Sequence, residues 1–250
     1  MEILNLFWVC LAAFLAGGLN SLAGGGSFIT LPSLLFAGIS PVLANTTSAA
    51  ALLPGYFGSV LGFRATFSTL EIKKLLPLLI ITTVCSIIGA FFLINSSDQF
   101  FMQFIPFLVL IATLLFIFNA RLEKGASTNS SSWYQKAGLS LVSAYGGYFN
   151  GGLGIALLSV LSLGKEFSIK QMSAVKSLLS FLITSISVSV FVFNGFIIWS
   201  YVVYMVFFSI MGGFFGAKLT ERLPTLFIRR FIIFIGLSLS ASLIFISYFK

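Results

Sequence analysis

The sequence contains no histidine, and only six of its 250 residues are carboxylates. The absence of histidine excludes a metal centre built on imidazole and hydrolysis by a Ser-His-Asp triad. Every carboxylate falls at an expected loop or chain end, so none is available within an apolar segment as a proton relay. These residues are Glu2, Glu71, Asp98, Glu123, Glu166 and Glu221.

Charged residues of both signs make up only 8% of the chain, against 58% hydrophobic residues and 30 phenylalanines. The mean hydropathy of +1.09 is far from that of soluble domains. The sequence therefore predicts a multi-pass protein of the cell membrane, with the lipid bilayer as a partner. Cys10 and Cys85 both lie in apolar segments, so we expect two buried thiols rather than a disulfide or metal site, and no cofactor.

The few charges that exist are mostly basic, giving a formal net charge of +8. They cluster in short loops between apolar runs, which is the positive-inside pattern of membrane proteins and not a nucleic-acid-binding stripe. The loops at residues 95–100 and 194–196 carry no base and are predicted to lie outside. The clusters predicted to be cytoplasmic are Arg64/Lys73/Lys74, Arg121/Lys124/Lys136, Lys165/Lys170 and Lys218/Arg222/Arg229/Arg230.

A glycine-rich stretch at residues 17–26 interrupts the apolar run from Ile3 to Phe36. Each glycine costs about 1 kcal/mol relative to alanine inside a helix, and irregular backbone within a membrane must be satisfied by protein or by a water-filled cavity. We therefore expect a break here, followed by a short helix over residues 27–36. The alternative is that the glycines only let helices pack closely, as small residues often do in membranes.

A second copy of this stretch occurs at residues 146–154, offset by 130 positions. Further along, residues 86–92 match residues 209–215 at an offset of 123. Two long registers in the same order indicate an internal repeat. The pairs related by the offset of 130 are Gly17/Gly147, Asn20/Asn150, Gly24/Gly154, Ile39/Ile169, Ala44/Ala174 and the conservative pair Thr47/Ser177.

The halves are predicted to be a first repeat at residues 1–122 and a second at 136–250, joined by a polar cytoplasmic linker at 123–135. Unbroken apolar stretches of about 20 residues can each cross a hydrocarbon core of about 30 Å. They cover residues 42–63, 75–94, 101–119, 174–193, 197–217 and 227–249.

Loop charge and the number of crossings together predict the topology. All basic clusters lie on one side only if each glycine-broken run enters and returns as a hairpin. Three further crossings per half make an odd number, which reverses the orientation of the second half. We therefore predict an all-α integral membrane domain of two inverted-topology repeats, each a broken or re-entrant helical hairpin plus three transmembrane helices.

Several of these motifs together resemble the TauE/SafE family of membrane transporters. They are the glycines at 24–26 with Pro32, the run Asn45-Thr46-Thr47-Ser48 after Ala44, and a degenerate second copy. The resemblance covers nearly the whole chain. It implies a secondary transporter, not an enzyme, that moves a small anion such as sulfite or an organosulfonate, often outward.

Two helices beginning inside the membrane would point their N-termini at the protein centre, where free N–H groups and partial positive charge favour an anion. Asn20 and Asn150 would either donate to the anion or cap backbone freed by the glycines. Hydroxyls can bind oxyanions, or bond back to their own helix. The candidate substrate-binding residues are Asn20, Gly24, Gly25, Gly26, Asn45, Thr46, Thr47, Ser48, Asn150, Gly152, Gly154, Lys176 and Ser177.

Lys176 admits two interpretations, because it lies six residues after Lys170. It either snorkels to the cytoplasmic interface or reaches inward as a fixed charge near the site. Two other function classes stay open: an intramembrane enzyme pairing Lys176 with Ser173, Ser177 or Ser180, and a membrane assembly subunit that transports nothing. The two halves are compatible with a monomer or a homo-oligomer.

Export of an anion needs no coupled ion, since the membrane potential contributes about 2.3 kcal/mol per charge per 100 mV. With no intramembrane carboxylate or histidine, outward uniport is physically sufficient. Import against that potential would require a coupling ion, and Na⁺ held by backbone carbonyls fits this composition better than protons.

Overall fold

The computed structural model describes residues 3–22, 25–122, 132–164 and 167–220, together with short helical pieces between 230 and 245. Over these residues the regular structure is helical throughout. The helices are α1 (Ile3–Leu22), α2 (Ser27–Phe36), α3 (Pro41–Gly62), α4 (Arg64–Phe67), α5 (Ile72–Ile94), α6 (Asp98–Leu122), α7 (Ser132–Tyr148), α8 (Leu153–Leu161), α9 (Ile169–Phe193) and α10 (Trp199–Thr220).

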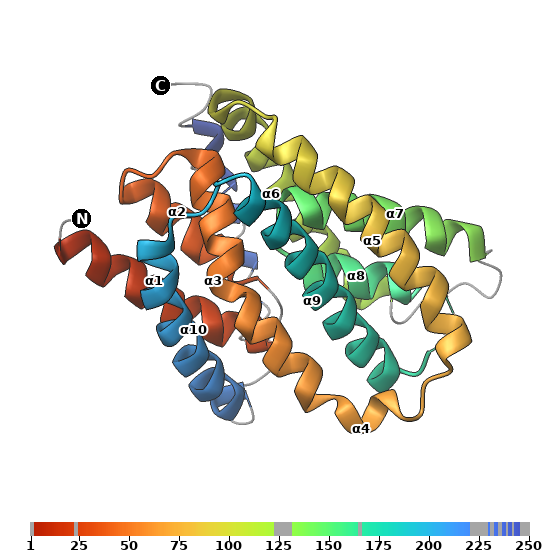
Figure 1. The fold of residues 1–250 in the computed structure, drawn as a ribbon. Coiled ribbons are helices and arrows are strands. Elements are labelled where there is room, and N and C mark those ends of the chain that lie inside the picture. The colour runs from red at the N-terminus through yellow and green to blue at the C-terminus, as the bar shows by residue number, and fades with distance from the viewer. Residues whose placement is uncertain are drawn as a thin grey trace.

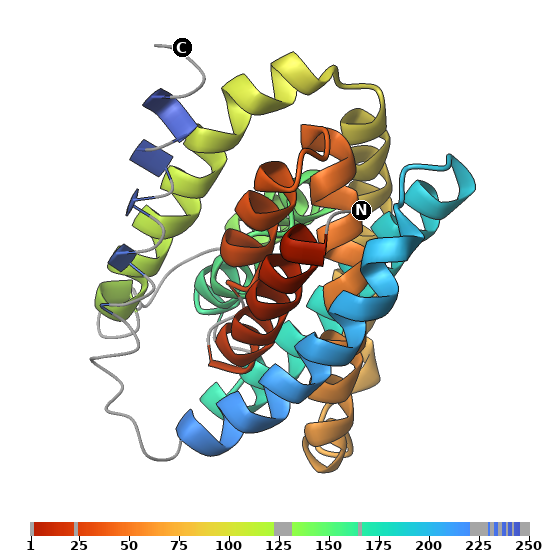
Figure 2. The same ribbon diagram turned by 90° about the vertical axis from the view of Figure 1, so that its left-hand side faces the viewer.

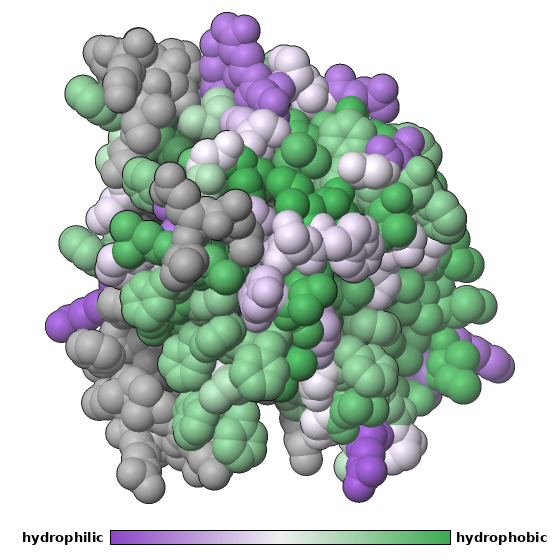
Figure 3. All heavy atoms as spheres, turned by 60° about the vertical axis from the view of Figure 1, so that its left-hand side comes forward, coloured by the Kyte–Doolittle hydropathy of each residue, from purple (hydrophilic) through white to green (hydrophobic). Residues whose placement is uncertain are grey.

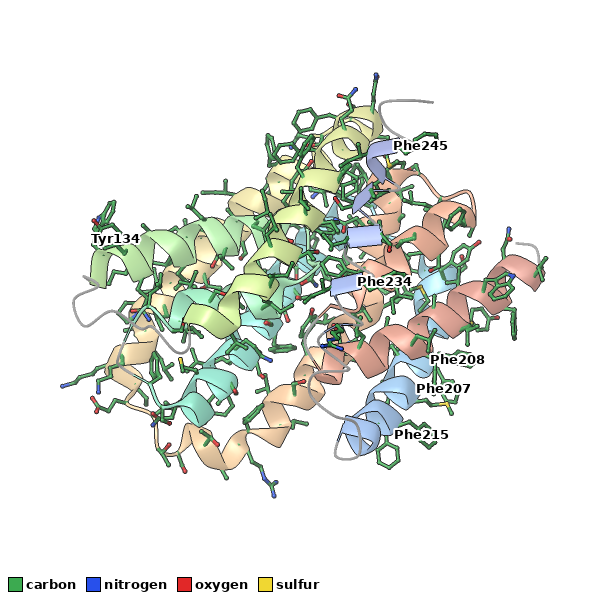
Figure 4. All side chains as sticks on the ribbon, turned by 180° about the vertical axis from the view of Figure 1, so that it is seen from behind. Tyr134, Phe207, Phe208, Phe215, Phe234 and Phe245 are labelled. Atoms are coloured by element: carbon green, nitrogen blue, oxygen red, sulfur yellow. The ribbon has the colours of Figure 1, made fainter. Side chains whose placement is uncertain are left out.

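The surface of this bundle suits lipid. Hydrophobic residues cover most of the face shown in Figure 3. On α10, Phe207 and Phe215 project away from the bundle and are 62% and 52% exposed (Figure 4). Two stretches of 23 residues, Ile72–Ile94 in α5 and Gln171–Phe193 in α9, contain 18-residue windows with mean hydropathies of 2.4 and 1.9, and 23 residues suffice to cross the bilayer. The fold is that of an all-α, multi-pass membrane protein.

Both expected helix breaks are present. The predicted short helix is confirmed as α2, whose bounds are Ser27–Phe36. In the second half α7 ends at Tyr148 and α8 begins at Leu153. Gly152 precedes α8 with φ of +73°, in the left-handed region that favours glycine over residues with a side chain.

Three boundaries differ from the sequence prediction. A one-turn helix, α4, follows α3, and α7 begins at Ser132, inside the expected linker. Helix α9 begins at Ile169 because of a capping box, in which the Ser168 hydroxyl and the Gln171 side chain each accept a backbone N–H from the other residue. Residues 123–131 of the linker and much of the last apolar stretch lie outside the described residues.

Helices from the two halves pair with each other. In Figure 1, α3 and α9 occupy the middle of the molecule, with α1 and α10 on one side and α5 and α7 on the other. The most extensive pairings are α1 with α10 and α5 with α7. In the first pair a Cβ on Gly17 would collide with the carbonyl oxygen of Ser209. In the second, a Cβ on Gly147 would collide with that of Ser86.

Each pairing is tight at a second glycine as well. A Cβ on Gly212 of α10 would collide with the carbonyl oxygen of Phe14, and one on Gly89 of α5 with that of Ala144. Small residues permit this approach of backbones, which is a main source of helix association in lipid. The glycines therefore fix how closely the two halves pack.

One end of the bundle gathers connections that carry no basic residue. The backbone N–H of Val42, at the start of α3, donates to the Asp98 carboxylate at 2.9 Å. The N–H of Ile198, just before α10, donates to the Thr47 hydroxyl at 3.2 Å. The α5–α6 and α9–α10 connections thus both contact the beginning of α3, and we call this the base-free end.

The opposite end holds the beginning of α9 and the segment after α4. There the Gln171 side-chain amide donates to the carbonyl oxygen of Thr69 at 3.4 Å. Arg64, Lys73 and Lys74 lie in this part of the chain, so we call it the basic end. Because α3 runs from the base-free end to the basic end and α9 runs back, the two central helices are antiparallel.

Helix α6 lies at the edge of the bundle, beside the helical pieces from the end of the chain (Figure 2). The Ser240 hydroxyl donates to the carbonyl oxygen of Pro106 in α6 at 3.0 Å. This layer therefore covers the bundle from outside and contributes no candidate site residue.

Candidate functional site

At the first break, Asn20 caps the freed backbone. Its Oδ1 accepts a hydrogen bond from the N–H of Gly26 at 2.8 Å. A Cβ on Gly26 would lie 2.7 Å from the carbonyl oxygen of Ala16, so this glycine lets α2 begin directly against α1. Gly25 makes only ordinary contacts, with a Cβ position 3.5 Å from the Phe28 ring. Gly24 lies outside the described residues.

At the second break, Asn150 joins two central helices instead of capping its own. Its Nδ2 donates to the Thr184 hydroxyl of α9 at 3.1 Å, and its Oδ1 accepts from the Tyr56 hydroxyl of α3 at 3.4 Å. Asn150 is 4% exposed. Gly152 directly precedes α8, and Gly154 lies in its buried first turn. The two asparagines that the sequence offset pairs therefore have different roles here.

The two breaks face each other across the centre of the molecule. A Cβ built on Gly151 would lie 2.8 Å from the Phe28 ring, which belongs to the first turn of α2. The Tyr145 hydroxyl donates to the carbonyl oxygen of Gly151 and satisfies part of the irregular backbone. Protein atoms, not open space, therefore surround these glycines, as the packing interpretation expects.

The predicted polar run at the start of α3 is buried and binds neighbouring elements. The Asn45 amide donates to the carbonyl oxygen of Tyr148 at 3.0 Å, at the end of α7. The hydroxyls of Ser48 and Thr30 share a hydrogen bond of 2.6 Å between α3 and α2. These contacts hold both helix breaks against α3.

The two threonines of the run bind the α9–α10 connection. The Thr46 hydroxyl donates to the carbonyl oxygen of Phe196, and the Thr47 hydroxyl accepts the N–H of Ile198. Both threonines are 0% exposed. Together they close the base-free end between α3 and α10.

The offset of 130 pairs Thr46 and Thr47 with Lys176 and Ser177. Within the described residues, neither Lys176 nor Ser177 forms a hydrogen bond to another element. The Ser177 hydroxyl donates to the carbonyl oxygen of Ser173 in its own helix at 3.0 Å. Lys176 is half-buried and forms no hydrogen bond or ion pair within the described residues. A nucleophile activated by Lys176 would require a hydrogen bond between the two groups, so the enzyme alternative has no support in this geometry.

A cavity of about 420 Å³ opens between α1, α3 and α10. Its polar lining includes Asn20, Tyr56, Ser59 and Ser209. The amide nitrogen of Asn20 donates to no described residue, so its N–H groups are available to the cavity. The α3 residues that line the cavity run from Leu52 to Ser59, toward the basic end.

Beyond the Tyr56–Asn150 hydrogen bond lies a second, closed space between α3, α7 and α9. Asn45, Ala49, Asn150 and Thr184 are among its lining residues, and no part of it is wide enough for a water molecule. The half of the bundle toward the basic end therefore holds an open cavity, whereas the half toward the base-free end is closely packed around Asn45, Ala49 and Asn150.

Sequence reasoning did not select Tyr56, Tyr145 or Thr184. Tyr56 and Ser59 are the polar side chains within the glycine- and proline-rich second half of α3, and a polar group at membrane depth is itself a functional signal. Thr184 and Ser180 follow Lys176 at helical spacing. The sequence is sufficient to predict that these residues share a helix face, but it does not predict the contact of Thr184 with Asn150.

Comparison with known proteins adds an independent observation. The family model described as sulfite exporter TauE/SafE matches residues 9–243. A probable membrane transporter protein of Haemophilus influenzae is 26% identical over 236 residues, covering 93% of this chain and 91% of that protein.

Two further relatives have similar names. The probable membrane transporter protein YfcA of Escherichia coli K12 is 27% identical, covering 97% of this chain and 90% of YfcA. The probable membrane transporter protein ORF9 of a Sinorhizobium species is 27% identical, covering 87% of this chain and 82% of that protein. No solved structure matches the chain.

Proposed function

We propose that this chain, which belongs to the TauE/SafE family of sulfite exporters, moves a small anion outward across the membrane. The family and its relatives are named for transport, so the chain is a membrane transporter and not an enzyme. Our proposal for the cargo is a sulfur oxyanion or an organosulfonate, and for the process a uniport driven by the membrane potential.

The observation that carries the proposal is the difference between the two ends of the molecule. A cavity of about 420 Å³ lies beside Asn20 and Tyr56, along the part of α3 nearer the basic end, while Thr46 and Thr47 close the base-free end. A carrier that alternates between two open states has one side open and the other shut in either state. An assembly subunit would need neither the cavity nor the closure.

Inverted repeats are supported by the glycine contacts between the halves. Gly17 packs on Ser209 and Gly147 packs on Ser86, and the sequence offsets of 130 and 123 exchange these two contacts. The same offsets exchange the contact of Gly212 with Phe14 for that of Gly89 with Ala144. A two-fold relation between the halves would produce this exchange, and the antiparallel course of α3 and α9 suits an axis in the membrane plane.

We propose that the anion binds where the two breaks face each other, between the starts of α2 and α8. Donors at this place are neutral: the amide N–H groups of Asn20 and Asn150 that are not used within the described part of the protein, and backbone N–H groups near Gly25, Gly152 and Gly154. Neutral donors and helix N-termini suit an acceptor-only ligand such as an ionised sulfonate or sulfite. We propose that the run from Asn45 to Ser48 closes this site on the side of the base-free end.

The test is flux in proteoliposomes that contain only this protein. We expect sulfite loaded inside to leave faster when a potassium diffusion potential makes the interior negative, because one negative charge gains about 2.3 kcal/mol per 100 mV. Methanesulfonate, which stays ionised, should respond in the same way at every pH between 6 and 8. Flux that ignores voltage but follows a proton gradient with methanesulfonate would refute the uniport.

A further inference from the structure

Helix α9 has a polar face along its buried side. At about 100° per residue, six of its polar residues fall within an arc of about 100°, while Ser185 and Ser189 lie elsewhere on the circumference. Four of the six are 3% exposed or less. The six residues are Ser173, Lys176, Ser177, Ser180, Thr184 and Ser187.

This face points into the space between α3 and α8. On one side of it, Phe181 packs on Phe57 of α3, with ring centroids 5.5 Å apart. On the other side, Leu179 and Ile183 belong to an apolar cluster with Leu157 of α8. The polar face therefore lies inside the protein and not against lipid.

Ser180 is the exception among the buried hydroxyls of this face. Ser177 and Ser187 donate to carbonyl oxygens one turn earlier, and Thr184 accepts from Asn150. Ser180 is 1% exposed, and its hydroxyl has no hydrogen-bond partner among the described residues. Buried polar groups are almost always paired, and an unpaired one points to a missing ligand.

Lys176 lies one turn before Ser180 on the same face. Residues four apart on a helix are neighbours, and their Cα–Cβ bonds tilt toward the helix N-terminus, so Ser180 and Lys176 lie next to each other on this face. The Lys176 ammonium offers three donors and uses none of them on described residues. A cation and an unpaired hydroxyl side by side form a complementary pair for a small anion.

Packing alone does not require a hydroxyl at this position. The offset of 130 relates Ser180 to Ala50 of α3, which is buried at 6% exposure without any polar atom in its side chain. Thr184 and Ser187 correspond to Pro54 and Phe57 in the same way. The polar face is thus specific to α9.

We propose that Lys176 and Ser180 form a binding position for a small oxyanion on the basic-end half of α9, one turn of helix before Thr184 and the central Asn150. This deepens the proposed function, on which it rests: the anion enters from the basic end, binds Lys176 and Ser180, and passes to the donors at the helix breaks. Ser180 is a substrate-binding residue in this scheme.

The experiment measures anion binding to the detergent-solubilised full chain by thermal shift, with sodium sulfite, sodium methanesulfonate or sodium chloride as the probe. We expect Ser180→Ala to weaken sulfite and methanesulfonate binding at least fivefold. Its unliganded melting temperature should stay unchanged or rise, since the substitution removes a buried hydroxyl that has no partner.

Ser185→Ala is the matched control. Ser185 has the other unpaired buried hydroxyl of α9, but it lies about 140° around the helix from Ser180. We expect its sulfite affinity to stay within twofold of the parent protein. Lys176→Gln should also weaken binding, and its effect should not add to that of Ser180→Ala if both residues hold the same anion.

The outcomes separate the two proposals. Parent protein that binds sulfite through Ser180 but moves none across liposomes would refute the transport proposal and leave the binding position standing. Parent protein that moves sulfite, with Ser180→Ala binding as well as Ser185→Ala, would refute the binding position and leave transport standing. The absence of any anion-dependent shift in the parent protein would also refute the binding position.

Discussion

Gly17 illustrates how one residue sets the distance between the two halves. Its Cα lies where α1 touches the Ser209 carbonyl of α10, and no side-chain carbon fits there. We expect Gly17→Ala to destabilise the fold by about 1–3 kcal/mol, the usual cost of overpacking. Thermal unfolding in detergent would show it as a lower melting temperature.

Gly62→Ala is the control for that experiment, because a Cβ on Gly62 meets nothing within 4 Å. It should leave the melting temperature unchanged or raise it slightly, since alanine is the better helix former. Equal melting temperatures for both variants would mean that α1 and α10 do not approach this closely.

The two asparagines show what could be read from single residues. For Asn20 the capping role was one of two predicted roles, and it acts on Gly26, only six residues away. Asn150 instead binds Thr184 and Tyr56, which are 34 and 94 positions away. Local chemistry predicts the first kind of contact. The second depends on which helices meet, and no local pattern contains that information.

At the scale of elements, turn and breaker residues were the most informative. Glycines 25 and 26 mark the start of α2 as predicted. The start of α9 was placed too late because Ser168 and Gln171, a capping pair, extend the helix beyond its apolar run. The α4 turn was not predicted, since its four residues carry no periodic pattern.

The contact between α3 and the α9–α10 connection yields a prediction about opening. Thr46→Val keeps the side-chain shape but removes the hydrogen bond to Phe196. Leaving that carbonyl unpaired costs about 1–2 kcal/mol, which corresponds to roughly a 5- to 30-fold shift toward opening of the base-free end. A cysteine at Ala49, beside the closed space, should react correspondingly faster with an external thiol reagent.

This labelling uses a background with Cys10 and Cys85 replaced by alanine. Thr113→Val is its matched control, because the buried Thr113 hydroxyl donates only to Val109 within α6. It should leave the labelling rate of the reporter unchanged. Unaltered labelling with Thr46→Val would show that this hydrogen bond does not hold the end shut.

For the whole molecule, composition and hydropathy were sufficient to identify a multi-pass helical membrane protein. They could not identify which helices pair. The contacts of α1 with α10 and of α5 with α7 join segments from opposite halves. They depend on glycine surfaces matching across the bundle, and the sequence only reveals that such glycines recur.

The inverted arrangement is testable by labelling introduced cysteines from either side. Ser97 follows α5, and Thr225, outside the described residues, follows α10. If the halves are inverted, a cysteine at Ser97 reacts only from outside and one at Thr225 only from the cytoplasm. Ser68, exposed at the basic end, provides the cytoplasmic reference. Reaction of Ser97 and Thr225 from the same side would refute the inversion.

The closed space beside Asn150 determines whether protons can pass through the centre of the protein along a file of water. Protons leak across membranes along unbroken files of water, and a water molecule needs room and polar partners. The space between α3, α7 and α9 has no such room, and Ala49 and Phe191 form part of its wall. The hydrogen bond between Tyr56 and Asn150 separates this space from the cavity of about 420 Å³. In this conformation no file of water can carry protons through that space.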